Sequence, residues 1–175
     1  IPVEGSDMKL YAQNFQGWLN LLKFNTILNV DMSNSITLDQ LKENSEGLFL
    51  VADPKGMEFR VADQIQVDYY QLDTANFLNS ERDADYLDNL ESFMKGDIKP
   101  ISITDAFYLE QEDYRTREAV QTINKKFDDK TDNQFFKSKT QYAGELVQMF
   151  EHGNTSWIQL FKKAVANEAE LIEGC

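Results

Sequence analysis

The chain holds one histidine, His152, and one cysteine, Cys175, and this scarcity limits the chemistry that its side chains can perform. A catalytic dyad needs a histidine beside a serine or cysteine nucleophile, and nothing in the sequence places His152 beside one. His152 precedes Gly153 at the predicted end of a helix, where a partly charged imidazole interacts favourably with the helix dipole. A zinc cluster needs several Cys and His ligands, so the sequence predicts neither a zinc site nor an internal disulfide.

Acidic side chains are the most numerous groups that could do chemistry. The 30 Asp and Glu residues could supply a glycosidase-like carboxylate pair, but no spacing singles one out. One acidic loop could hold a hard cation, although the same residue types dominate solvated turns: Asp128, Asp129, Asp132 and Asn133. Residues 31–42 fail as a calcium loop because Ile36 and Lys42 stand where that loop requires Gly and Glu. We therefore expect no metal and no cofactor.

The composition excludes several classes of partner. The 17 Lys and Arg residues against 30 Asp and Glu give a net charge of −13, which would repel a phosphate backbone, so nucleic acid is not an expected partner. No apolar run reaches the length of a transmembrane segment. The 175 residues, 42% of them hydrophobic, fit a single soluble domain over 1–175. Because the chain begins with Ile1, a processed or secreted chain is plausible, and Asn154 begins a possible glycosylation site.

The hydrophobic pattern predicts an α+β domain in which a small antiparallel sheet packs with helices. Strands are expected where apolar residues run together or alternate: 26–30, 48–51, 57–61, 65–72 and 98–103. Helices are expected over the remaining apolar stripes: 10–24, 38–41, 74–95, 112–127, 143–151 and from 155 or 156 onward. Thr37 and Gln40 form a capping-box pattern. A strong turn signal at 53–56 predicts a β-hairpin over 47–62.

Four short segments between Asn25 and Phe150 follow one another in the order found in a known family. They are Asn25-Thr26-Ile27-Leu28, Ser45-Glu46-Gly47-Leu48-Phe49-Leu50-Val51, Phe59-Arg60-Val61-Ala62 and Gln141-Tyr142-Ala143-Gly144-Glu145-Leu146-Val147. In order and spacing they resemble the opening strand, histidine strand, acid-bearing strand and cysteine helix of the YiiX-like permuted papain-like amidases, circularly permuted relatives of NlpC peptidases. The resemblance implies a permuted papain-like arrangement of one domain.

The catalytic positions of that family are substituted in this chain. In the family a Cys thiolate attacks an amide or ester carbonyl, a His transfers the proton, and a third polar residue orients the His. The matching positions hold Ala143, Glu46 and Arg60. A methyl group cannot form an acyl-enzyme, Glu46 would rarely return a proton to a leaving group, and Arg60 offers no acceptor. The resemblance therefore implies a pseudoenzyme with no functional catalytic residue. Its vestigial cleft would be formed by Glu46, Arg60, Tyr142, Ala143 and Gly144.

The substituted positions also predict a specific contact. If the family's His and acid touch across neighbouring strands, Glu46 and Arg60 would form another complementary pair, either as an ion pair or through one water. Glu58 lies two residues before Arg60, on the same face of a strand, and is an alternative retained acid.

Three functions remain open from the sequence. The first is a non-catalytic domain that binds a peptide, an acyl-containing small molecule or a protein partner in the vestigial cleft. The second is an active or engineered-inactive thiol hydrolase that acts on amide or ester bonds. The third is an acidic structural or interaction protein that docks through its C-terminal helix, although an apolar stripe on a helix most often faces its own core.

Overall fold

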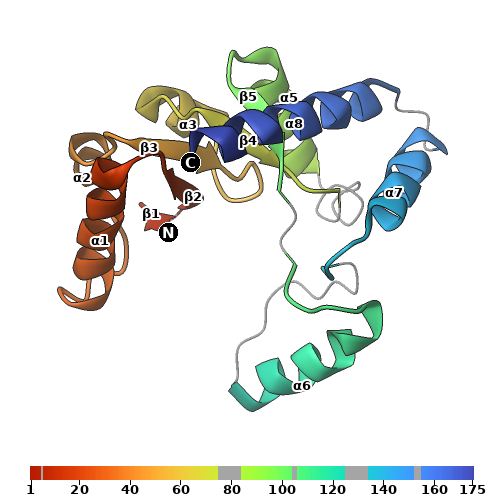
Figure 1. The fold of residues 1–175 in the computed structure, drawn as a ribbon, viewed down its shortest axis with the longest axis horizontal. Coiled ribbons are helices and arrows are strands. Elements are labelled where there is room, and N and C mark those ends of the chain that lie inside the picture. Colours follow the sequence, from red (N-terminus) through yellow and green to blue (C-terminus); the bar gives the residue numbers. More distant parts are fainter. Residues whose placement is uncertain (5, 75–83, 104–105, 125–133, 152–154) are drawn as a thin grey trace.

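The computed structural model describes residues 1–4, 6–74, 84–103, 106–124, 134–151 and 155–175. Within these ranges one sheet has the strand order β1-β2-β3-β4-β5: β1 (Pro2–Val3), β2 (Ser6–Ala12), β3 (Leu48–Ala52), β4 (Tyr69–Leu72) and β5 (Lys99–Ser102). Seven α-helices and one short 3-10 helix occupy the same ranges (Figure 1): α1 (Phe15–Asn29), α2 (Leu38–Glu43), α3 (Phe59–Ile65), α5 (Ala84–Lys95), η1 (Gln111–Asp113), α6 (Tyr114–Asn124), α7 (Lys139–Glu151) and α8 (Thr155–Gly174). The predicted α+β class is confirmed.

The sheet is mixed, so the prediction of an antiparallel sheet is wrong for its second half. Strands β1, β2 and β3 pair antiparallel, whereas β3, β4 and β5 pair parallel. Parallel neighbours need a crossover connection, and α3 and α5 supply the two crossovers. The carboxyl ends of β3, β4 and β5 therefore meet at one edge of the sheet.

The predicted β-hairpin over 47–62 is wrong after its first strand. β3 forms where expected, and the turn at 53–56 follows it. The next residues form α3, in which Ala62 and Ile65 are buried while Arg60 is exposed. A spacing of three between buried side chains fits one face of a helix, whereas a strand would bury every second residue.

Helix α1 covers residues for which the sequence predicts two different elements. The helix predicted over 10–24 begins only at Phe15, because β2 occupies the preceding residues. The strand predicted over 26–30 is wrong, since α1 continues to Asn29. Asn14 starts the helix by accepting a hydrogen bond on Oδ1 from Gly17 N at 3.0 Å.

Several other local predictions are confirmed. The strand predicted over 98–103 is β5, and the strand predicted over 65–72 is confirmed in its second half as β4. In the capping box, Thr37 N donates to Gln40 Oε1 at 3.0 Å and Gln40 N donates to Thr37 Oγ1 at 3.1 Å. Helices α5, α6, α7 and α8 lie where the sequence predicts helices.

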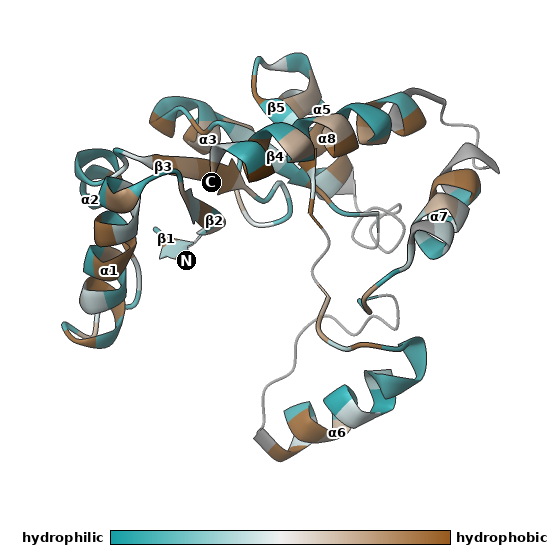
Figure 2. Ribbon diagram, viewed as in Figure 1, coloured by the Kyte–Doolittle hydropathy of each residue, from teal (hydrophilic) through white to brown (hydrophobic). Residues whose placement is uncertain are grey.

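Successive side chains of a strand point to opposite faces of the sheet. In the central strands both sets are largely apolar, so both faces of the sheet are buried. On one face the main core joins strand residues to helix residues: Leu48, Leu50, Tyr70, Leu72, Phe24, Leu41, Phe93, Phe161 and Ala164. On the other face Val51, Tyr69 and Ile101 pack with Leu171 of α8. Figure 2 shows β3 as largely hydrophobic, which fits a strand covered on both sides. Within the described part of the chain, no helix combines the length and hydrophobicity of a membrane span.

A contact between two glycines holds α1 against the start of β3. A Cβ added at Gly17 would lie 1.8 Å from the carbonyl oxygen of Gly47. Gly47 has a φ of +73°, and a Cβ there would lie 2.4 Å from Oδ1 of the capping residue Asn14. One turn further along α1, Asn20 Nδ2 donates to the carbonyl of Glu46 at 2.9 Å. The backbones of α1 and the turn before β3 are therefore in direct contact.

Candidate functional site

Three buried polar residues lie at the edge where the parallel strands end. Asp73 and Thr74 directly follow β4, and Ser102 is the last residue of β5. Leu72 and Ser102 are partners in the parallel register, which places these polar groups side by side. In open sheets with parallel strands, ligands bind outside the carboxyl ends of those strands.

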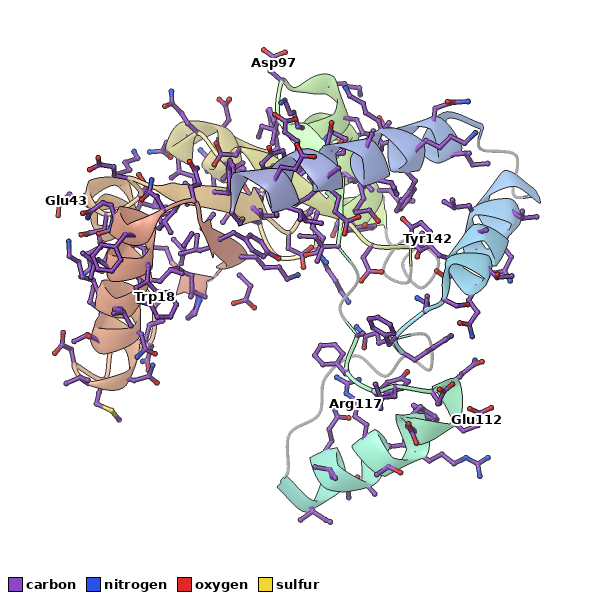
Figure 3. The ribbon with its side chains drawn as sticks, in the orientation of Figure 1. Trp18, Glu43, Asp97, Glu112, Arg117 and Tyr142 are labelled. Atoms are coloured by element: carbon purple, nitrogen blue, oxygen red, sulfur yellow. The ribbon has the colours of Figure 1, made fainter. Side chains whose placement is uncertain are left out.

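Helix α7 adds two polar side chains to this edge. Ser138 begins the helix with a capping box, in which Ser138 N donates to Gln141 Oε1 at 2.8 Å and Gln141 N donates to Ser138 Oγ at 3.3 Å. Tyr142 and Glu145 are three residues apart and so share one face of the helix. Tyr142, labelled in Figure 3, lies on the side of α7 that faces the sheet.

Both side chains of α7 bond to the strand ends. The hydroxyl groups of Tyr142 and Ser102 are 2.6 Å apart, and Thr74 Oγ1 donates to Glu145 Oε2. These two contacts join α7 to the ends of β4 and β5; the Thr74–Glu145 bond is buried and the Ser102–Tyr142 contact is partly buried. Because the Thr74–Glu145 bond is shielded from water, it contributes more than it would on the surface.

Lys137, just before α7, adds a cation to the polar side chains of Thr74, Ser102, Tyr142 and Glu145. Its Nζ lies 3.0 Å from Glu145 Oε1, and the two side chains are 3% and 10% exposed. The same Nζ lies 5.5 Å from the ring centroid of Phe135, within the range of a cation–π contact. Although it is in ion-pair contact, this buried ammonium makes no hydrogen bond of good geometry to any residue that the structure describes. An ammonium has three N–H donors, so Lys137 has donors available to a further group.

A pocket of about 570 Å³ opens between β5, α7, α8 and the segment 135–138. Most of its wall is apolar: Tyr11, Ile101, Ile103, Phe135, Val165, Leu171 and Ile172. Five polar residues interrupt this wall: Ser102, Lys137, Ser138, Tyr142 and Glu168. An apolar wall with a few convergent polar groups is the usual lining of a small-molecule site.

Two acidic groups of the pocket wall have raised pKa values. The pKa of Tyr142 is raised to about 12, chiefly by burial; the hydrogen bond to Ser102 lowers this pKa, and the negative charges of Asp73, Glu168 and Glu145 raise it. Burial also raises the pKa of Glu168. Tyr142 therefore stays neutral near pH 7 and can share a hydrogen bond with Ser102.

The residues predicted from the resemblance are not brought together. Glu46 lies in the turn before β3, Arg60 in the first turn of α3, and Ala143 in α7, and all three are exposed. Figure 1 shows α7 on the opposite side of the molecule from α3 and β3. Among the predicted cleft residues, only Tyr142 lines the pocket, while Gly144 is exposed with no atom within 4 Å of an added Cβ.

The predicted ion pair between Glu46 and Arg60 is not formed. No described residue makes an ion pair with either side chain, because Arg60 is on a helix rather than on a strand beside Glu46. Glu58, the alternative acid, is the exposed N-cap residue of α3. Cys175 is exposed after α8. The remaining candidates lie outside the described residues: His152, Asn154, Asp128, Asp129, Asp132 and Asn133.

Removing the charges of Glu46 and Arg60 is expected to leave the fold almost unchanged. Glu46→Gln and Arg60→Gln should each change the free energy of unfolding by less than about 0.5 kcal/mol, because neither exposed side chain has a described partner. Urea denaturation of the two single variants and the double variant measures this. A coupling energy above about 0.5 kcal/mol between the two substitutions would mean that the side chains do interact.

Most residues of the pocket were not identified from the sequence, although some left a signal. Ser102 of the pocket wall lies within a predicted strand, and Asp73 and Thr74 beside the pocket directly follow another, but these three polar residues become a group only once the strands are known to be parallel. Ser138 and Gln141 form a capping-box pattern that places α7.

The hydroxyl groups of Ser102 and Tyr142 face each other at the pocket wall. A serine nucleophile needs a base that accepts its proton, and the described partner of Ser102 is the phenol of Tyr142. Among the residues that the structure describes, no group of three or more His, Cys, Asp or Glu is placed to hold a metal ion. Comparison with models of known protein families and with curated proteins finds no match to this chain.

Proposed function

We propose that this chain is a ligand-binding domain whose site is the pocket between β5, α7, α8 and residues 135–138. The observation on which the proposal rests is the buried Lys137 ammonium, which lines the pocket and has donors beyond its contact with Glu145. Buried polar groups are nearly always hydrogen-bonded, so a donor left without such a bond at a pocket wall suggests a ligand acceptor.

The lining of the pocket indicates the kind of ligand. Ile101, Phe135 and Leu171 offer an apolar surface for the body of a small molecule. Lys137 Nζ would donate to an oxygen of the ligand, and the Ser102–Tyr142 pair would accept or donate a further hydrogen bond. The pocket volume lies within the range of about 300–1,000 Å³ that is typical of small-molecule sites.

The resemblance to the permuted papain-like amidases stays a prediction, and our proposal does not depend on it. If the chain is a permuted papain-like protein, we propose that it is a non-catalytic member and that its ligand binds away from Ala143, Glu46 and Arg60. This keeps the binding function that the resemblance suggests but moves its site to the carboxyl edge of the sheet. A thiol hydrolase would require a nucleophile at Ala143, whose side chain is exposed outside the pocket.

Filling the pocket is expected to abolish binding of an apolar probe. A suitable probe is 3-phenylpropan-1-ol, which has an apolar body and one hydroxyl group; at about 0.3–0.4 kcal/mol per heavy atom its Kd should be about millimolar. Val165 lines the pocket and is 44% exposed, so Val165→Trp should fill the pocket without entering the core and weaken binding at least tenfold. Saturation-transfer NMR measures both affinities.

A matched substitution separates a filled pocket from a general effect of the indole group. Val147 on α7 is 55% exposed and does not line the pocket, so Val147→Trp should bind the probe as the unmodified chain does. Equal affinity in Val165→Trp and Val147→Trp would contradict the proposed site. Absence of binding to the unmodified chain at about ten times the expected Kd would also contradict it.

A further inference from the structure

Glu168 is the one ionisable group of the pocket wall whose charge no described residue balances. Lys137 is paired with Glu145 at 3.0 Å, so that pair is neutral as a whole. Glu168 lines the pocket from α8 and makes no hydrogen bond or ion pair with any residue that the structure describes. A carboxylate partly withdrawn from water without a partner is destabilised in its charged form, which agrees with its raised pKa.

The sequence of α8 explains why Glu168 has no partner on its own helix. On a helix, side chains interact with those three and four positions away. For Glu168 these positions hold only apolar residues: Ala164, Val165, Leu171 and Ile172. Three of these residues line the pocket beside the carboxylate: Val165, Leu171 and Ile172. The Glu168 carboxylate thus lies on an apolar wall. Its neighbours on α8 supply no cation, so a cationic partner would come from outside this helix.

Three carboxylates act on the phenol of Tyr142 in the pocket wall. Asp73, Glu145 and Glu168 all lie near enough to Tyr142 for their charges to raise the pKa of its phenol. Because the Lys137–Glu145 pair is neutral as a whole, the charge left on the pocket wall is that of Glu168, and this charge favours a positively charged group beside it.

We propose that the ligand bears a protonated amine beside its apolar body and that Glu168 binds this amine. This inference rests on the proposed function, because it assigns the charge of a ligand in the same pocket. The apolar body would pack on Val165, Leu171 and Ile172, and the ammonium would donate to the Glu168 carboxylate. The ligand class is thus an amphipathic primary amine that also offers an oxygen to Lys137.

Two probes of equal size test the inference directly. In 2-amino-3-phenylpropan-1-ol an ammonium replaces the methyl group of 2-methyl-3-phenylpropan-1-ol, while the aromatic body and the hydroxyl stay the same. The unmodified chain is expected to bind the amino probe about tenfold more tightly than the methyl probe, as a hydrogen bond to a charged group predicts. In Glu168→Gln the preference for the amino probe should be lost, because the carboxylate that distinguishes the two probes is absent.

Control variants make each outcome decisive. Glu173 is an exposed carboxylate on the same helix outside the pocket, so Glu173→Gln should keep the tenfold preference. Equal binding of both probes by the unmodified chain, with loss of both in Val165→Trp, would overturn the role of Glu168 and leave the proposed function standing. A preference for the amine that survives Glu168→Gln would also overturn it. Failure of both probes to bind the unmodified chain would overturn the proposed function itself.

Discussion

Replacing Gly17 with alanine is expected to destabilise the fold by about 3 kcal/mol or more. Helix propensity alone predicts the opposite sign, since alanine in a helix is favoured over glycine by about 1 kcal/mol. The added methyl carbon would lie 1.8 Å from the carbonyl oxygen of Gly47, and both partners are backbone that cannot rotate away. The α1 helix would have to separate from β3, so chemical denaturation should show a lower free energy of unfolding.

A second glycine provides the control for this prediction. Gly144 lies in α7, is exposed, and has no atom within 4 Å of an added Cβ. Gly144→Ala should therefore follow helix propensity and stabilise the chain by about 0.5–1 kcal/mol. If Gly17→Ala and Gly144→Ala raised the melting temperature alike, the contact between α1 and the turn before β3 would be wrong.

Replacing Lys137 with methionine is expected to cost about 3–5 kcal/mol of stability, because it leaves the Glu145 carboxylate buried without a cation. Adding Glu145→Gln to this variant should recover part of the loss, since an amide has no charge to compensate and still accepts the hydrogen bond from Thr74. The double variant is thus predicted to be more stable than Lys137→Met alone. Urea denaturation of the four members of this cycle measures the coupling.

An exposed ion pair of equal length serves as the comparison. Lys95 and Glu91 on α5 also lie 3.0 Å apart, but their side chains are 76% and 55% exposed. Lys95→Met should cost less than about 1 kcal/mol, because solvent screens an exposed pair. Equal losses for Lys95→Met and Lys137→Met would show that Lys137 is not buried against Glu145.

The sequence was sufficient to predict elements that depend on local chemistry. The Thr37–Gln40 capping box and the apolar run of β3 are local signals, and both appear in the structure. The residues after β3 were mispredicted because the turn at 53–56 can lead into either a strand or a helix. The burial of Ala62 and Ile65, three residues apart, distinguishes the two, and that pattern is short enough to be missed.

The site was harder to predict than the fold because it depends on contacts between distant segments. Tyr142 was identified through the resemblance and does line the pocket, but its partner Ser102 is 40 residues away. Thr74 meets Glu145 across 71 residues. Such contacts follow from the parallel order of β4 and β5, which no local pattern in this chain specifies.

We propose that the ligand binds at the carboxyl edge of the parallel strands. The most direct test is a series of two-dimensional ¹H–¹⁵N NMR spectra of the chain during titration with 3-phenylpropan-1-ol. We predict that the largest shift changes fall on the amides of 101–103, 137–142 and 165–172, the segments that contribute side chains to the pocket wall. Changes centred instead on the exposed apolar residues Phe15, Trp18 and Leu22 of α1 would contradict the claim.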